Sequence, residues 1–262
     1  MRVDAAAEQL AAAGCVRAAE EASILVADAG TADEVAARVA RRVAGEPLEH
    51  VVGWSEFRGL RLAVADGAFV PRTASGLLVE EAASIVRCLA GPGREVLVVD
   101  LCCGVGAVGA ALAAEVPHLR VHASDVDPRA VACAERNLAA CGGRVHLGDL
   151  FHALPRRLRG RTDLVVSSPP YVPTDQIRLL PTEARVFEST TALDGGPDGL
   201  ALVERIAREA RRWLAPGGRL VVEVSEVQVD DAALLVEELG YRCRGVTSEE
   251  LGAAVVVGSP SG

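Results

Sequence analysis

Three aspartates mark the ends of short apolar runs that are typical of buried strands. Asp100, Asp125 and Asp149 each stand at, or just after, the end of such a run. Because the carboxyl ends of parallel strands meet at one edge of a sheet, we expect these side chains around one ligand site. Carboxylates there can accept hydrogen bonds from ligand hydroxyl and amino groups, and they attract positive charge. The pattern therefore predicts a site for a hydroxylated or cationic ligand.

A glycine-rich loop, VVDLCCGVGAVGAAL, surrounds the first of these aspartates. Gly104, Gly106 and Gly109 satisfy the pattern GxGxxG, which on its own would indicate a nicotinamide or flavin enzyme. The GxGxxG pattern is weak evidence here, because glycine and alanine are so frequent in this segment that it can arise by chance. Asp100 stands four residues before Gly104, which gives the form D-x-x-x-G-x-G. This form resembles motif I of the S-adenosylmethionine-dependent methyltransferases.

The resemblance implies roles in binding S-adenosylmethionine for Asp100, for the loop Cys102, Cys103, Gly104, Val105 and Gly106, and for Asp125, Asp149, Leu150 and Ser168. Asp100 would face the cationic part, Asp125 would accept from both ribose hydroxyls, and Asp149 and Leu150 would flank the adenine. An alternative for Asp125 is the N-cap of a helix starting at Pro128, although Asp127 suits that position better. The adjacent cysteines have neither zinc-site spacing nor a basic neighbour, so we interpret them as small residues in a crowded loop.

A second motif, SSPPY, follows a fourth apolar run. Ser168, Pro169, Pro170 and Tyr171 resemble the N/D/S-P-P-Y motif of methyltransferases that act on exocyclic or amide nitrogens. An amide nitrogen is a poor nucleophile, so it must be held in line with the methyl group while its N–H groups bond to acceptors. Adjacent prolines stiffen the loop, leaving carbonyls free to accept, and Tyr171 can pack on a planar group.

Two flanking segments narrow the resemblance. Residues 45–72, GEPLEHVVGWSEFRGLRLAVADGAFVPR, and residues 186–200, VFESTTALDGGPDGL, resemble segments of the HemK/PrmC family of protein-(glutamine-N5) methyltransferases. The likeness spans residues 40–258 in order. It implies methylation of the glutamine in the Gly-Gly-Gln motif of peptide-chain release factors, with Ser168, Pro169, Pro170 and Tyr171 holding that glutamine. The chain departs from the family at Ser168, where the family has Asn, and at the uncharged residues 73–76. Its N-terminal region is also short, so its substrate need not be a release factor.

The elements that must position these residues alternate between strand and helix after residue 93. Strands are expected at 95–100, 119–124, 144–147, 163–167 and 219–224, with helices between them and two final strands at 241–246 and 253–257. This predicts an α/β, Rossmann-like class I methyltransferase fold with a mostly parallel seven-stranded sheet and an antiparallel edge. We expect a helical substrate-recognition region over 1–53 with two helices in 4–44, a connecting hairpin over 54–72, and the methyltransferase domain over 73–262.

Composition favours a protein acceptor over a nucleic acid. The 262 residues carry a formal net charge of -9, whereas binding through phosphates needs a basic face. Seven cysteines without a CxxC pair indicate a reduced, cytoplasmic protein without a structural zinc, and no apolar run is long enough for a membrane span. Three alternatives stay open: methylation of an exocyclic amine of RNA or DNA, a cofactor-binding paralogue with weakened catalysis, and a nicotinamide oxidoreductase.

Overall fold

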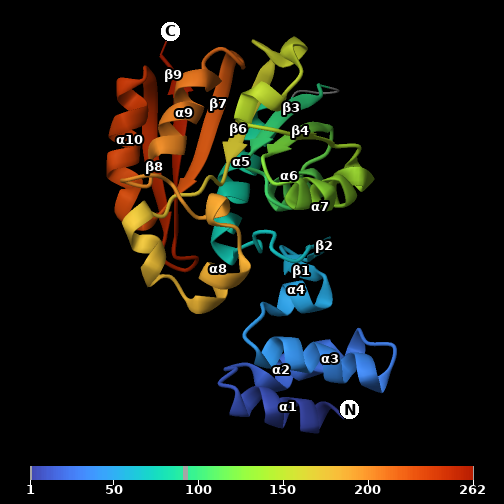
Figure 1. Cartoon of the computed structure of the whole chain (residues 1–262). Helices are drawn as coiled ribbons and strands as arrows, with labels where there is room; N and C mark the ends of the chain where they lie inside the picture. Colours follow the sequence, from blue (N-terminus) through green and yellow to red (C-terminus); the bar gives the residue numbers. More distant parts are fainter. Residues whose placement is uncertain (1, 91–93, 262) are drawn as a thin grey trace.

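The computed structural model describes residues 2–90 and 94–261, so the predicted turn at 91–93 lies outside the described residues. A seven-stranded sheet of order β5-β4-β3-β6-β7-β9-β8 forms its centre (Figure 1). Strands β5 to β7 run parallel, and β9 runs antiparallel to both of its neighbours. The predicted mostly parallel α/β sheet is therefore confirmed. The strands are β3 (Val96–Leu101), β4 (Leu119–Asp125), β5 (Arg144–Leu147), β6 (Thr162–Ser167), β7 (Leu214–Val224), β8 (Tyr241–Ser248) and β9 (Ala253–Pro260).

Helices cover both faces of this sheet, which explains why the central strands β3 and β6 are buried throughout. Val96 and Val98 of β3 pack into one apolar cluster, and Leu97 and Val99 pack into another on the opposite face. The alternation follows from the two-residue period of a strand. The first cluster includes residues of α5 (Gly76–Leu89), α6 (Ala107–Glu115) and α7 (Pro128–Leu138), and the second includes residues of α9 (Ala201–Ala210) and α10 (Val229–Glu238).

Four N-terminal helices form a separate group at one end of the molecule (Figure 1). They have their own apolar cluster, which includes Leu10, Leu25 and Val39. The prediction of two helices in residues 4–44 was wrong, because a break at Gly14, with φ of +88°, divides the first of them. Thr31 caps the third helix by accepting from the Glu34 N–H at 3.2 Å. The helices are α1 (Val3–Ala12), α2 (Ala18–Ala27), α3 (Ala32–Val43) and α4 (Leu48–Val52).

A two-stranded hairpin connects these helices to the large sheet. Strands β1 (Trp54–Phe57) and β2 (Leu60–Ala63) are joined through Arg58 and Gly59, whose φ values of 50° and 76° make a tight turn that suits the twist of a hairpin. The backbone of Ala63 donates to the Asn137 side chain at 2.8 Å and accepts from it at 3.0 Å, so the hairpin is fixed to α7. The predicted domain limits at residues 53 and 72 stay a prediction.

No helix in the described ranges 2–90 and 94–261 is both long enough and apolar enough to cross a membrane.

Candidate active site

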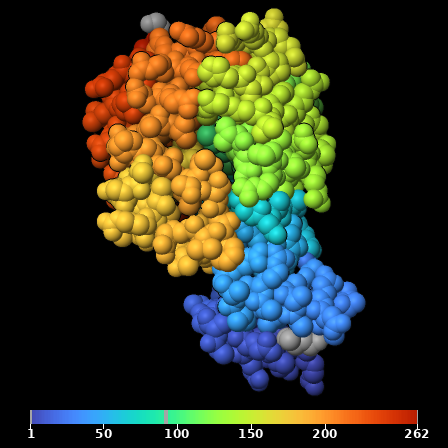
Figure 2. Space-filling model, viewed as in Figure 1, coloured from blue at the N-terminus to red at the C-terminus, as the bar shows by residue number. Residues whose placement is uncertain are grey.

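A cavity of about 600 Å³ opens at the carboxyl ends of the central strands. Cys102 and Gly104 come from the loop after β3, Asp125 ends β4, and Ser168 follows β6. Figure 2 shows the corresponding hollow between the green and orange parts of the molecule. From the neighbouring strands β3 and β6, the chain adds β4 and β5 on one side of the sheet and β7 on the other. Ligands of open parallel sheets bind at such a switch point, outside the carboxyl ends of the strands.

The loop after β3 bends sharply around the cavity. Cys102, Gly104 and Gly106 have φ values of 52°, 53° and 80°, a region that side chains other than glycine rarely adopt. A Cβ on Gly104 would meet nothing within 4 Å, so this glycine leaves open space beside the cavity. A Cβ on Gly106 would lie 3.1 Å from the Ala134 Cβ. Gly106 therefore lets the start of α6 approach α7 and does not line the cavity.

Asp125 organises the cavity floor between two backbone segments. Its Oδ2 accepts from the Gly104 N–H at 2.8 Å, and its Oδ1 accepts from the Asp127 N–H at 2.9 Å. Each carboxylate oxygen retains a lone pair for a ligand hydroxyl. Burial raises the pKa of Asp125 in spite of these bonds. Asp127, and not Asp125, caps α7, because its side chain accepts from the Arg129 N–H at 2.8 Å.

Asp100 does not line the large cavity. It is fully buried at the end of β3 and lines a smaller cavity together with the loop residues Cys102, Cys103, Gly104, Val105 and with Ser168. Its Oδ2 accepts from the Gly109 N–H at 3.0 Å, whereas its Oδ1 has no hydrogen-bond partner among the described residues. Burial is the main cause that raises the pKa of Asp100 to about 7. This orphaned oxygen marks a place where a cationic or N–H-bearing ligand group would be stabilised.

The loop after β5 closes the same end of the cavity. Leu150 is buried with φ of 45°, and the Ser124 hydroxyl donates to its carbonyl at 3.1 Å. Asp149 lines the cavity beside it and forms an ion pair with Arg205 of α9 at 2.6 Å. The structure thus brings Asp125, Asp149 and Leu150 together around one end of the cavity.

The Ser-Pro-Pro-Tyr loop forms another wall. Ser168, Pro169, Pro170 and Tyr171 all line the cavity, and no described residue forms a hydrogen bond to the Ser168 or Pro169 carbonyl. Burial is the main cause that raises the pKa of Tyr171 to about 12, so its hydroxyl stays neutral at ordinary pH. The Gln228 side chain donates to the Tyr171 carbonyl at 3.0 Å and to the Asp198 carbonyl at 2.9 Å.

A glycine-rich loop, residues 193–199, holds the tyrosine end of that wall. The Val172 N–H donates to the Leu193 carbonyl at 3.1 Å, and the Gly195 N–H donates to the Val172 carbonyl at 2.9 Å. A Cβ on Gly195 would lie 2.7 Å from the Pro170 carbonyl oxygen, and one on Gly199 would lie 2.2 Å from that of Tyr171. The glycines in this segment are therefore needed for close approach to the Ser-Pro-Pro-Tyr loop.

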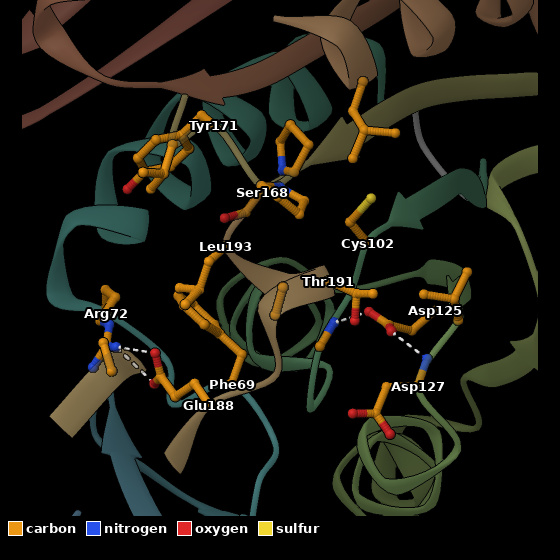
Figure 3. A pocket seen from close by; sticks show the side chains of 18 of the residues that line it. Phe69, Arg72, Cys102, Asp125, Asp127, Ser168, Tyr171, Glu188, Thr191 and Leu193 are labelled. Carbon is orange, nitrogen blue, oxygen red and sulfur yellow. Dashed lines mark hydrogen bonds and ion pairs between the residues drawn. The ribbon is translucent and has the colours of Figure 1, made fainter. Parts of the chain in front are cut away.

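An ion pair on the side of the cavity opposite Asp125 joins residues 70–72 to Glu188. Arg72 donates to both oxygens of Glu188 at 2.6 and 2.7 Å, and the Val70 N–H adds a bond of 3.2 Å. Figure 3 shows this pair opposite the Asp125 and Asp127 side chains, with Phe69 and Leu193 nearby. Glu188 is buried, and this burial raises its pKa although Arg72 opposes the change. Neither Arg72 nor Glu188 was predicted as a site residue, although they lie in the segments 45–72 and 186–200 that resemble the HemK/PrmC family.

The cavity lining carries more acidic than basic side chains, with six carboxylates and two arginines. Arg72 pairs with Glu188 and Arg205 with Asp149, while two arginines outside the lining, Arg129 and Arg42, pair with Asp127 and Glu183. A dinucleotide site presents a helix N-terminus to an anionic pyrophosphate, which this charge would repel. The cavity therefore suits a cationic ligand. The carboxylates are Glu49, Asp125, Asp127, Asp149, Glu183 and Glu188.

The adjacent cysteines are poor candidates for thiol chemistry. Burial and nearby carboxylates raise the pKa of Cys102 to about 12, and they raise that of Cys103 as well. A thiol in this environment stays protonated and is a weak nucleophile and metal ligand. Among the residues that the structure describes, no group of three or more metal-binding side chains gathers.

Known proteins resemble this chain in sequence and in fold. Residues 74–197 match the Methyltransferase small domain family. The ribosomal protein L11 methylase of Lactobacillus delbrueckii subsp. bulgaricus has a TM-score of 0.52 and 13% identity over 76% of this chain and 84% of that one. A methyltransferase of Pyrococcus furiosus has a TM-score of 0.51 and 16% identity over 75% and 87%. At these identities the solved structures establish the fold alone.

Curated relatives are closer in sequence. A release factor glutamine methyltransferase of Streptomyces coelicolor is 43% identical over 206 residues, 78% of this chain and 72% of the relative. One from Geobacter sulfurreducens is 37% identical over 81% and 72%. A 4-amino-L-phenylalanine/4-methylamino-L-phenylalanine methyltransferase of Streptomyces pristinaespiralis is 36% identical over 77% and 69%. With its strand order, its glycine loop and its Ser-Pro-Pro-Tyr wall, the chain belongs to the HemK/PrmC family of protein-(glutamine-N5) methyltransferases.

Proposed function

We propose that this enzyme transfers a methyl group from S-adenosylmethionine to the side-chain amide nitrogen of a protein glutamine, the substrate being a peptide-chain release factor. One observation carries the proposal: a single acidic cavity joins the Asp125 end to the Ser-Pro-Pro-Tyr wall. A methyl donor and a planar amide acceptor can therefore lie side by side in it. Two relatives named release factor glutamine methyltransferase, of Streptomyces coelicolor and Geobacter sulfurreducens, support the choice of acceptor.

The residues of the cavity suit S-adenosylmethionine better than a nicotinamide. Asp125 offers two carboxylate oxygens for vicinal ribose hydroxyls, and Gly104 leaves room for a close backbone approach. Leu150 and Asp149 flank the space in which an adenine would lie. The orphaned Oδ1 of Asp100, behind the loop, favours positive charge nearby. When bound, the cofactor supplies an electrophilic methyl group on a sulfonium.

The Ser-Pro-Pro-Tyr wall orients the acceptor amide. The Ser168 hydroxyl and the carbonyls of Ser168 and Pro169 are available as acceptors for two N–H groups, which would aim the nitrogen lone pair along the transfer direction. Pro169 and Pro170 fix the backbone before the substrate binds, so the loop does not have to be ordered when the transition state forms. Tyr171 offers an aromatic face to the planar amide.

The cavity mouth suits a protein substrate. Pro47 and Glu49, beside and within α4, and Glu183 of α8 (Thr182–Phe187) reach the lining from outside the sheet. We infer that the N-terminal helices and α8 together bind the loop that carries the glutamine. The acidic groups at the mouth would attract a basic segment of that partner. A release-factor substrate would put the enzyme in the cytoplasm.

A second candidate acceptor is a free aromatic amine. The Streptomyces pristinaespiralis relative carries the name of an enzyme acting on 4-amino-L-phenylalanine, and Ser168 departs from the Asn expected of glutamine methylation. An amino group on a ring is planar and presents two N–H donors, as an amide does. The acidic net charge of -9 disfavours the RNA or DNA alternative, and membership of a methyltransferase family disfavours a nicotinamide oxidoreductase.

The test uses labelled S-adenosylmethionine with release factors, 4-amino-L-phenylalanine and total RNA as separate acceptors. We expect label on the release factor, at a glutamine identified by mass spectrometry. Tyr171→Ala should lower this activity, because the planar amide loses the aromatic face that packs on it. Label on the amino acid or on RNA, with none on protein, would overturn the proposed acceptor. Tighter calorimetric binding of NAD than of S-adenosylmethionine would overturn the cofactor.

A further inference from the structure

A buried carboxylate lies behind the Ser-Pro-Pro-Tyr wall. Glu223 of β7 is only 2% exposed, and its Oε2 has no hydrogen-bond partner among the described residues. The register pairs Ser167 of β6 with Val222 of β7, so Ser168 and Glu223 are the next residues on two adjacent strands. A buried charge without a full set of partners is costly and therefore calls for an explanation.

Two serine hydroxyls lie beside this carboxylate: that of Ser75, at the end of the short 3-10 helix η1 (Thr73–Ser75), and that of Ser168, the neighbour of Glu223 across the β6–β7 pair. Burial raises the pKa of Glu223, and the two hydroxyls oppose that rise because they favour the charged form. After burial, the charge of Glu223 raises the pKa of Tyr171 and that of Arg72 lowers it. Ser168 is thus the polar link between the buried carboxylate and the large cavity that it lines.

The direction of the Ser168 hydroxyl decides what it can do for an acceptor nitrogen. A hydroxyl has one proton to donate and two lone pairs that accept. If the proton points into the cavity, it meets the N–H groups of the substrate, and two donors face each other. If it points to an ionised Glu223, the lone pairs face the cavity, and charge on the carboxylate makes the oxygen a stronger acceptor.

We propose that Glu223 is a positioning residue for methyl transfer: its carboxylate accepts the Ser168 proton in a hydrogen bond, turns the Ser168 lone pairs to the acceptor nitrogen, and takes up through Ser168 the proton that this nitrogen loses. The inference rests on the proposed N-methylation and gives it a route for the proton. It also provides Ser168 with the acceptor character that the family's Asn has in its own carbonyl.

The proton balance is complete within these groups. The acceptor nitrogen forms one bond to the methyl carbon while the bond between that carbon and sulfur breaks, and the nitrogen must then lose one proton. That proton moves to the Ser168 oxygen as the original Ser168 proton moves to Glu223. The nitrogen ends neutral, Ser168 is again a hydroxyl, and Glu223 is a neutral acid. When the product leaves and water enters the cavity, the same two transfers run in reverse and restore the carboxylate.

A double-mutant cycle tests the pair. In wild type, Glu223→Gln should lower kcat for the release factor about 10- to 100-fold, the range for one hydrogen bond to a charged group, with little change in KM. In a Ser168→Ala background the same substitution should change kcat less than about twofold, because the link to the cavity is already gone. Equal losses in both backgrounds would overturn the proposal, since Glu223 would then act without Ser168.

Asp163→Asn is the matched control. Asp163 is also a buried carboxylate, but it lies at the other end of β6 and accepts from the Leu97 N–H at 2.9 Å. Asp163→Asn should lower stability, and it should leave unchanged the ratio of kcat between the Ser168 and Ser168→Ala backgrounds. A loss of kcat from Asp163→Asn as large as that from Glu223→Gln would mean that any buried carboxylate of β6 or β7 matters equally, and would count against a specific pair.

A second readout does not depend on the acceptor. In carbon-13 NMR of protein labelled at the glutamate carboxyl carbon, the Glu223 signal is the one missing from Glu223→Gln. It should titrate above the ordinary value of 4.5, and higher still in Ser168→Ala, because a hydrogen bond that favours the charged form is lost. An unchanged midpoint in Ser168→Ala overturns the pair. A shifted midpoint in an enzyme that methylates no release factor would instead refute the proposed acceptor while the pair stands.

Discussion

Asp100→Asn should make the protein more stable at pH 8 and less stable at pH 4. The Asp100 carboxyl is fully buried, and one of its oxygens has no partner among the described residues. Its pKa of about 7 in the folded protein lies far above the ordinary value of 3.8, mainly because burial disfavours the charged form. Asn has nearly the same shape and no charge, so the substitution removes the cost of ionisation.

The magnitude follows from the two pKa values. Below pH 3.8 the carboxyl is protonated in both the folded and the unfolded chain, and it costs nothing. As the pH rises to about 7, the unfolded chain loses this proton first, so folding stability falls. Since one pKa unit is worth 1.36 kcal/mol, the full cost above that pH is about 4 kcal/mol. An unpaired Asn amide costs about 1–3 kcal/mol at any pH, which leaves a net gain of about 1–3 kcal/mol at pH 8.

Urea denaturation of wild type and Asp100→Asn at pH 4, 6 and 8 measures this difference directly. The free energies of unfolding should cross between pH 4 and pH 8. Asp163→Asn is the control with the opposite sign at pH 8, because the Asp163 carboxylate is paired with Arg94 and accepts from the Leu97 N–H. Parallel curves for wild type and Asp100→Asn across this range would refute the reasoning, because Asp100 would then ionise without cost.

Three other substitutions test the cavity. Asp125→Asn should weaken S-adenosylmethionine binding about 10- to 100-fold in calorimetry by removing one charged hydrogen bond, whereas Asp127→Asn, which removes a helix cap, should mainly lower Tm. Gly199 and Gly217 have similar φ values of +79° and +82°, but an added Cβ would lie 2.2 Å from the Tyr171 carbonyl oxygen at Gly199 and would meet nothing within 4 Å at Gly217. Gly199→Ala should therefore unfold at a lower urea concentration than Gly217→Ala; equal losses of stability would mean that the contact relaxes freely. Glu188→Gln should cost about 1–3 kcal/mol in unfolding free energy, against about 0.5 kcal/mol for the exposed Glu95→Gln; a similar loss in both would show that the Arg72 contact is unimportant.

The central strands β3 and β6 could be predicted because they are short and buried on both faces. The run 144–147 coincides with β5, and the other predicted strands up to residue 167 overlap β3, β4 and β6. Where local pattern and tertiary packing compete, prediction was poorer. The local pattern of residues 200–214 favours one helix, yet α9 ends at Ala210, because Trp213 turns into the core against Phe151 and Leu214 already pairs with Thr162. The Ala-rich N-terminal segment has too little contrast between apolar and polar positions to reveal its breaks.

The site residues divide in the same way. Gly104, Asp125 and Ser168 are near one another because strand ends of a parallel sheet must be, so sequence order alone suffices to bring them together. Arg72 and Glu188 are 116 residues apart, and only folding shows that they pair. Both residues lie in the segments 45–72 and 186–200, which resemble the HemK/PrmC family, but the sequence gives no physical reason for their presence there. The structure gives one, because the bond between them fixes residues 69–72 against the segment 186–200, which also contacts the Ser-Pro-Pro-Tyr loop.

Unpartnered buried oxygens connect stability to function in this protein. Among the described residues three buried polar side-chain atoms have no partner: Arg38 Nη1, Asp100 Oδ1 and Glu223 Oε2. Two of them are carboxylate oxygens at the ends of β3 and β7, and Ser168 lies near both: it lines a small cavity with Asp100 and neighbours Glu223 across the β6–β7 pair. Folding alone gains nothing from such oxygens, because each raises the cost of ionisation. A cationic methyl donor near Asp100 and a departing proton at Glu223 would each offset that cost. The two carboxylates therefore connect the stability of the fold to the charges that methyl transfer would bring to this site.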